Sequence, residues 1–358
     1  MLKITGSRLN CVAGVAILLA CGIAHAQGSV TLYGIADGGL LYTSKTAGSN
    51  GQNAGHNFSM VDSGYMPTSF GLKGVENLGG GLTASFDLES GVSLANGGFN
   101  DSNGNFFGRQ AWVALGGGFG QITAGVQFSP FFLAVYESDP RGMAYLGSAL
   151  VNYADNVLVT GAMNSNAVSY TSPKIAGFTG SALLALGGQA GNFQAGRQYS
   201  ASLKYEGGGL MVNAAIYDGN SGGTAQTPVP STEEFEGREL GLAYTFGSLT
   251  AKVSFVNYKV AGSFDSNVYS GGLDCQVLPE LDISGGVYVT SDRNDSSNHS
   301  LVVALGTQYF LSKATALYAQ VGVVNNHGAM NTGLALNGAL NGVEGTTVGA
   351  NVGIRKSF

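Results

Sequence analysis

The chain has 358 residues, of which 11% are charged, 44% are hydrophobic and 58 are glycine, and its formal net charge is −6. This charged fraction is less than half of the roughly 25% typical of soluble globular domains, which argues against an ordinary cytosolic enzyme. The sequence has no basic cluster that would neutralise a phosphate backbone, so nucleic acid is not expected as a partner.

The first 26 residues have the pattern of a secretory signal peptide. Lys3 and Arg8 precede an apolar stretch, residues 12–23, and the sequence Ala-His-Ala ends at Ala26. Cleavage after Ala26 is predicted, which leaves residues 27–358 as a single exported domain. Beyond this leader, no run approaches the ~18 to 20 consecutive apolar residues that a membrane-spanning helix requires.

A lipoprotein signal is the competing interpretation of the leader. In that case Cys21 would be acylated, but strand-like sequence begins at Ser29 and leaves no tether. Cys11 and Cys21 both leave with the signal peptide, so the exported domain retains only Cys275 and has no internal disulfide.

Sixteen segments of the exported domain carry apolar residues at every second position, the period that places them on one face of a β-strand. In the last segment, apolar residues at even positions from Val348 to Ile354 alternate with glycine, asparagine and arginine. The predicted strands, in chain order, are 29–44, 68–77, 82–92, 106–116, 120–128, 166–174, 178–187, 197–206, 210–218, 237–247, 249–260, 267–276, 281–291, 299–310, 315–324 and 348–358.

Short connections rich in glycine or proline alternate with long polar ones. The long connections include 45–67, 129–165, 219–236 and 325–347. Short turns on one side and long loops on the other are typical of an outer-membrane barrel, whose strands of ~9 to 11 residues cross the bilayer and leave no open edge. A soluble β-sandwich is the alternative, but it gives no reason for this segregation. The predicted fold is all-β: a sixteen-stranded antiparallel transmembrane β-barrel.

The connection 129–165 is expected to fold inward and constrict the barrel. It is long and rich in apolar residues, so it must be buried against something, and the lumen is the available shelter. A solvated outside loop is the alternative. Its charged residues are the candidate constriction residues: Glu137, Asp139, Arg141 and Asp155.

No constellation for catalysis, cofactor or metal is recognised. The exported domain has three histidines, His56, His299 and His327, which lie in or beside predicted loops without a nucleophile motif and are interpreted as ordinary solvated side chains. Cys275 lacks metal-ligand spacing. We therefore expect neither an enzyme nor a bound cofactor.

Several segments, in the right order, resemble those of general diffusion porins of Gram-negative bacteria, especially the beta-proteobacterial branch. The resemblance covers the chain from Ser29 to Phe358. The matching segments are SVTLYGIAD (29–37), FGLKGVENLGGGL (70–82) with FDLESG (86–91), FGRQAWV (107–113), YTSPKIAGF (170–178) and the terminal Phe358.

This resemblance implies a homotrimer of sixteen-stranded barrels in the outer membrane of a Gram-negative bacterium. Each barrel would hold a water-filled pore for passive diffusion of small polar solutes, constricted by an inward-folded third loop. Outer-membrane lipid and lipopolysaccharide would surround it, and Phe358 would be part of the signal read by the barrel assembly machinery.

The chain departs from the family where the pore wall usually carries arginines. Ser69 and Val126 stand at two such positions, while Lys73 and Arg109 keep family-like contexts. All four are candidate pore-wall residues, although Lys73 is equally interpreted as a charge at the periplasmic rim. With arginines missing, a cation-leaning or weakly selective pore is expected.

Two other functions remain open at this point. In a substrate-selective porin, Tyr136, Tyr145 and Tyr153 of the third loop would form an aromatic track for one class of ligand. In a structural barrel or adhesin, the lumen would be plugged.

Overall fold

The computed structural model describes residues 29–157, 162–220 and 234–358, with the backbone alone for residues 155–157. The predicted signal peptide, residues 1–26, and most of the predicted loop 219–236 lie outside the described residues. Two helices and nineteen strands are described: β1 (Ser29–Thr43), β2 (Asn57–Asp62), β3 (Ser69–Gly79), β4 (Leu82–Gly91), β5 (Gln110–Gly117), β6 (Gly120–Phe128), α1 (Pro130–Ser138), α2 (Ala149–Val157), β7 (Met163–Thr171), β8 (Phe178–Ala185), β9 (Gln198–Gly207), β10 (Leu210–Asn220), β11 (Glu234–Phe246), β12 (Leu249–Val260), β13 (Asp265–Leu278), β14 (Leu281–Asp292), β15 (His299–Ser312), β16 (Thr315–His327), β17 (Thr332–Ala335), β18 (Ala339–Asn341) and β19 (Gly345–Ser357).

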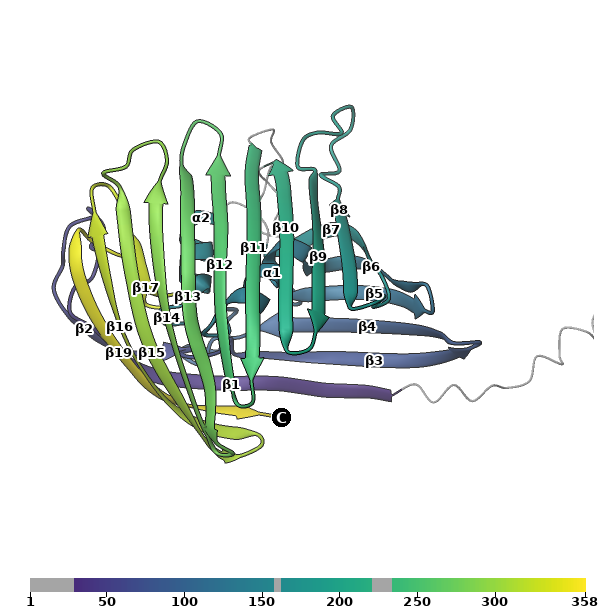
Figure 1. The fold of residues 1–358 in the computed structure, drawn as a ribbon, viewed down its shortest axis with the longest axis horizontal. Helices are drawn as coiled ribbons and strands as arrows, with labels where there is room; N and C mark the ends of the chain where they lie inside the picture. Colours follow the sequence, from purple (N-terminus) through teal and green to yellow (C-terminus); the bar gives the residue numbers. More distant parts are fainter. Residues whose placement is uncertain (1–28, 158–161, 221–233) are drawn as a thin grey trace, which may run out of the picture.

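The wall is a closed antiparallel ring. Each wall strand pairs with its neighbour in the chain, and β1 closes the ring by pairing with β19, from Ile35 opposite Ser357 to Thr43 opposite Gly349 (Figure 1). The main sheet has seventeen strands, but β2 only extends the β3 side of the ring, beside residues 38–43 of β1. The other sixteen strands form the wall, as predicted from the sequence.

The connections differ between the two ends of the barrel. One end has tight turns at 80–81, 118–119, 208–209, 247–248, 279–280 and 313–314, with 172–177 the longest. The other end has the long connections, among them 44–68, 92–109, 129–162 and 328–344. The predicted segregation of turns and loops is therefore confirmed.

Strand ends differ from the prediction where a loop folds back on the wall. The predicted strand 106–116 begins at Gln110, because Asp101 and Asn103 adopt positive φ and the loop packs Gly108 against Ser102. The predicted loop 325–347 contains the hairpin of β17 and β18.

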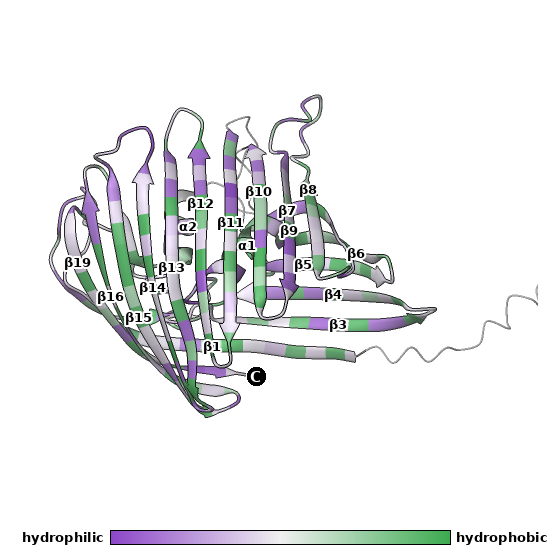
Figure 2. Cartoon of the chain, in the orientation of Figure 1, coloured by the Kyte–Doolittle hydropathy of each residue, from purple (hydrophilic) through white to green (hydrophobic). Residues whose placement is uncertain are grey.

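Side chains alternate between a lipid-facing and an inner face. On β11 and β12 the outward residues Leu240 and Val253 are 55% and 52% exposed, while the adjacent Glu239 and Ser254 point inward. Figure 2 shows the same alternation as green and purple bands along the wall strands. Burying such an outer face in lipid accounts for the large apolar exposure of the isolated chain.

None of the described helices has the length and apolar character to cross a membrane. Both α1 and α2 lie within the curve of the wall (Figure 1). They belong to the third loop, residues 129–162, which brings the candidate residues into the lumen.

Candidate functional site in the barrel lumen

The third loop enters the lumen through a well-capped helix. Ser129 precedes α1 and its side-chain oxygen accepts the Phe132 backbone N–H at 3.0 Å, while Pro130 occupies the first helical turn, where no N–H is needed. Phe131 is fully buried and packs beside Tyr153, Tyr217 and Tyr258. Since Tyr217 and Tyr258 are inner-face residues of β10 and β12, α1 is fixed against that side of the barrel.

Inner-face glycines make room for this docking. A Cβ at Gly237 would lie 2.6 Å from the Phe131 ring, one at Gly306 would lie 2.9 Å from the Arg141 guanidinium, and one at Gly322 would lie 3.2 Å from Leu146. The missing side chains let the loop approach the wall backbone closely. These glycines lie on β11, β15 and β16, so the loop is received along one broad arc of the wall.

Asp139 joins the two helices of the loop. Its side chain is fully buried, and its carboxylate accepts the backbone N–H groups of Met143 at 2.6 Å and of Ala149 at 3.2 Å. The Tyr288 hydroxyl of β14 donates to the same carboxylate at 2.6 Å. Because Ala149 begins α2, the carboxylate also lies at a helix N-terminus, where negative charge is favoured.

Arg141 ties the loop to the opposite part of the same arc. It is 2% exposed and donates to the Ser284 carbonyl at 3.2 Å, the Leu146 carbonyl at 3.1 Å and Gln320 Oε1 at 2.7 Å. Asp139 and Arg141 were expected to line the aperture. The structure instead buries both side chains between the loop and the wall. Their hydrogen bonds hold the loop in place.

Glu137 is the one predicted constriction acid whose described side chain stays partly exposed. Its carboxylate accepts from Lys204 Nζ at 2.7 Å and lies 3.4 Å from Asn213 Nδ2. The predicted Asp155 falls in α2, but its side chain lies outside the described residues.

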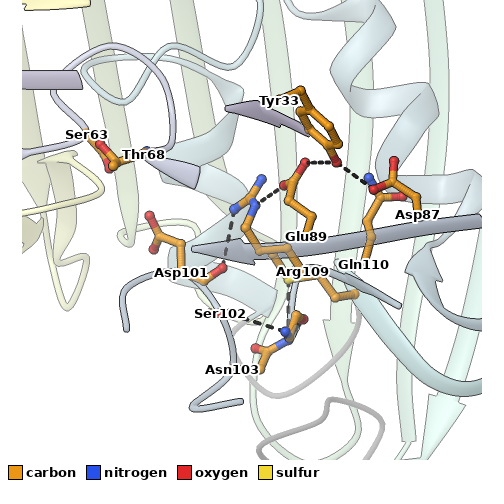
Figure 3. A network of polar contacts seen from close by, with 12 residues as sticks. Tyr33, Ser63, Thr68, Asp87, Glu89, Asp101, Ser102, Asn103, Arg109 and Gln110 are labelled. Atoms are coloured by element: carbon orange, nitrogen blue, oxygen red, sulfur yellow. Dashed lines mark hydrogen bonds and ion pairs between the residues drawn. The ribbon is translucent and has the colours of Figure 1, made fainter. Parts of the chain in front are cut away.

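The wall facing the free side of the loop carries its own polar cluster (Figure 3). The Tyr33 hydroxyl donates to Asp87 Oδ1 at 2.6 Å and lies 3.0 Å from Glu89 Oε2. Glu89 forms an ion pair with Arg109, which is 8% exposed. Lys73 remains exposed on this inner face, with its ammonium 4.7 Å from the centre of the Tyr33 ring.

The loop 92–109 continues this cluster toward the third loop. Arg109 donates to the Asp101 carbonyl at 3.3 Å, and the Tyr145 hydroxyl donates to the Asp101 carboxylate at 2.9 Å. Burial raises the pKa of Asp101, although the Tyr145 hydrogen bond acts in the opposite direction. Burial also raises the pKa of Tyr145 well above its usual value.

The two positions without arginines differ in their orientation. Ser69 pairs with Ile35 and Gly91 on the inner face and is 6% exposed. Val126, predicted as a wall residue of the pore, pairs with Ala111. Its neighbours Gly125 and Gln127 lie on the inner face, at a register shift in the pairing of β6 with β7. Because successive residues of a strand alternate between the two faces, Val126 points to the outer face.

Two hollows flank the free side of the third loop. The first has a volume of about 350 Å³ and is lined by Arg109, Asp101, Met143, Tyr136 and Leu133, among others. The second, of about 490 Å³, is lined by Gln110, Trp112, Glu137, Lys204 and again Leu133. Phe128 and Leu133 line both, so the two hollows lie next to each other.

The sequence analysis considered an aromatic track of Tyr136, Tyr145 and Tyr153. All three line the first hollow. Tyr136 is 42% exposed, whereas Tyr145 and Tyr153 are 4% and 3% exposed. Among the described residues, no group of three or more histidine, cysteine or acidic side chains is placed to hold a metal ion.

Asp87, Glu89 and Tyr33 are functional candidates that the sequence analysis did not name. Asp87 and Glu89 could have been recognised from the sequence, because they are two residues apart in a predicted strand and so share one face, and charged residues are rare in this chain. What the sequence does not contain is the position of Tyr33, two strands away across β3.

Comparisons with protein families, with curated proteins and with solved structures all find porins. The model of the Gram-negative porin family matches residues 13–329. Outer membrane porin protein 32 of Delftia acidovorans is 29% identical, over 96% of this chain and 98% of the relative. The solved structure of an anion-selective porin from Comamonas acidovorans superposes with a TM-score of 0.79 at 25% identity, covering 93% of this chain and all of the other.

A more distant solved structure has the same fold. The trimer form of the outer membrane protein OmpT of Vibrio cholerae superposes with a TM-score of 0.67 at 15% identity, over 92% of this chain and 99% of that one.

Replacing Arg141 should test its role as a tether. Arg141→Ala leaves the Ser284, Leu146 and Gln320 acceptors without their buried donor, so we expect the free energy of unfolding to fall by about 3 kcal/mol. Chemical unfolding in lipid vesicles, followed by tryptophan fluorescence, measures this. Replacement of the exposed Arg293, whose ion pair with Asp265 is solvated, should cost less than about 1 kcal/mol. Equal stability of both variants would contradict the tether.

Proposed function

The chain belongs to the Gram-negative porin family and is an outer-membrane channel for passive diffusion; we propose that its permeation path runs between the third loop and the wall strands β3 to β6. The observation that supports this path is the pair of adjacent hollows that share Phe128 and Leu133 in their lining. The opposite side of the third loop is packed against the wall through buried contacts, among them those of Phe131, Val135 and Leu146.

The limiting aperture in this proposal is set by the exposed side chains of α1. Leu133 and Tyr136 are 44% and 42% exposed and line the open space, whereas Phe131 and Val135 on the other side of the same helix are buried. Trimming the exposed pair should therefore widen the path without loosening the helix.

The double change Leu133→Ala with Tyr136→Ala should raise single-channel conductance in planar bilayers. The pore radius limits conduction, and these side chains project into the path. Leu240→Ala, on the lipid-facing side of β11, serves as the control and should leave conductance unchanged. An unchanged conductance in a correctly assembled double variant would place the path elsewhere.

We further propose that the channel leans toward cations. The inner face of the wall strands carries eight acidic residues, of which Asp37, Glu89 and Glu239 are buried and Asp87, Glu206, Asp274, Asp282 and Asp292 are not, against four basic residues, Lys73, Lys204, Lys252 and Arg355. Arg109 pairs with Glu89 and Lys204 with Glu137, whereas Lys73 is exposed beside the Tyr33 ring. The charge difference thus favours passing cations.

Selectivity should respond to Asp87, because it lies on the inner face of β4 beside Tyr33 and lacks an ion-pair partner of its own among the described residues. Two unit charges ~8 Å apart interact by about 2 kcal/mol at an effective dielectric of ~20. Asp87→Asn should therefore shift the reversal potential in a dilute potassium chloride gradient toward anions. The shift should shrink in 1 M salt, where the Debye length is about 3 Å.

The control for this measurement is Asp295→Asn, in the exposed connection between β14 and β15. It should leave the reversal potential unchanged. Strong anion selectivity of the unmodified protein, as in the Comamonas porin's description, or an equal shift in both variants would overturn the assignment of selectivity to the inner wall.

A homotrimer completes the proposal. The OmpT structure in trimer form supports it, and so does an apolar patch on the outer face near β1 and β2. Its residues are Phe58, Met60, Leu94, Phe99 and Phe106, each 45% to 66% exposed. Leu94, Phe99 and Phe106 come from the loop 92–109, which folds over this face, and a second copy of the chain is the occupant that this patch fits.

The double change Phe99→Glu with Phe106→Glu should convert trimers into monomers. Burying a carboxylate in an apolar interface is costly, whereas the isolated barrel gains only two solvated charges. Light scattering in mild detergent measures the mass of the assembly. The control is Phe193→Glu, an exposed phenylalanine in the connection between β8 and β9, which should keep the trimer. Trimers in both variants would rule out the patch as the interface.

Export and assembly follow from the same proposal. Cleavage after Ala26 would release the barrel, outer-membrane lipid and lipopolysaccharide would cover its apolar face, and the terminal strand would be read by the barrel assembly machinery. The exposure of Phe358 supports recognition by the machinery. Its backbone exchanges hydrogen bonds with Gly34, while its ring is 59% exposed.

A further inference from the structure

Two histidines stand side by side on adjacent strands at the end of the barrel that carries the long loops. His299 is the first residue of β15 and His327 the last of β16, and the register places them directly opposite each other. Their rings are stacked, with centroids 4.4 Å apart and planes 17° apart. Both side chains are exposed, on the outer face of the wall.

The backbone on both sides of this pair is fixed. Asn298, next to His299, accepts the Ala329 N–H on its side-chain oxygen at 2.7 Å. The His327 carbonyl accepts the Met330 N–H at 3.3 Å, and Gly328 takes the positive φ that this corner requires. The two imidazoles are therefore held next to each other by the ladder and by the loop corners, and do not depend on a chance encounter of mobile loops.

We propose that His299 and His327 form a two-histidine site for a divalent transition metal, with copper(II) or zinc(II) as the ligand class. Imidazole nitrogen is a preferred ligand of both metals, with metal–nitrogen distances of about 2.0 to 2.1 Å. Two such bonds at roughly 90° to 110° need nitrogens about 3.0 to 3.4 Å apart. The centroid distance of 4.4 Å suits this separation, and the rings must turn about their Cβ–Cγ bonds out of the stacked arrangement so that one nitrogen of each points at the metal.

Waters complete the coordination, because the described residues offer no third histidine, cysteine or acid in a cluster with this pair. Calcium and magnesium prefer oxygen ligands and are not expected to bind. The metal would link β15 to β16 at the rim and lies outside the proposed permeation path, so this inference does not rest on the selectivity or the aperture.

The test uses untagged, metal-free protein purified in detergent. Titration with copper(II), followed by electron paramagnetic resonance, should show about one copper per chain with nitrogen hyperfine splitting, and zinc(II) should displace it while magnesium does not. His299→Asn and His327→Asn should each weaken binding by at least about tenfold, since each removes one of two ligands. Heat-dependent mobility on gels verifies that every variant keeps its barrel.

His56→Asn is the matched control, because His56 is also exposed but lies alone in the connection between β1 and β2. It should bind copper like the unmodified protein. A second readout is thermal unfolding: zinc should raise the midpoint of the unmodified protein and of His56→Asn, but not of the His299 and His327 variants. Binding that survives both of these substitutions, or that disappears with His56→Asn, overturns the site.

Discussion

The absence of water inside a membrane is the constraint on which this structure depends. Every backbone N–H and C=O within the apolar belt needs a partner in the protein, and the pairing of β1 with β19 provides the last row of these hydrogen bonds. Closure fixes the alternation of side chains, and the alternation creates a polar interior. The third loop can then be buried because the inner face of β9 to β16 offers both hydrogen-bond partners and glycine-lined space.

The wall was predictable from the sequence because it rests on a local rule. Apolar residues at every second position between Val348 and Ile354, and in fifteen earlier segments, are enough to place the strands, and the resemblance to porins agreed. The observed strand boundaries differ from the predicted ones where a loop folds back onto the wall, as it does before Gln110. Whether a loop folds back depends on contacts with distant residues, which the alternation of apolar residues along a strand does not reveal.

The candidate site was predictable only in part, for the same reason. That the loop 129–165 contains charged residues is evident from the sequence, but the role of each depends on distant partners. Tyr288 turns Asp139 into a tether, and Gln320 does the same for Arg141, from positions more than a hundred residues away. A buried carboxylate and a pore-lining carboxylate look alike in a sequence, and only the surrounding donors distinguish them.

The one-sided docking of the third loop makes the open space asymmetric. One side is a helix surface with a leucine and a tyrosine, and the other is a wall with the polar side chains of Asp101, Arg109 and Gln110. A solute in this open space contacts an apolar surface and a charged surface at the same time. On the proposed permeation path, we therefore expect molecules with one apolar and one polar side to enter in a preferred orientation, because each side meets a matching surface.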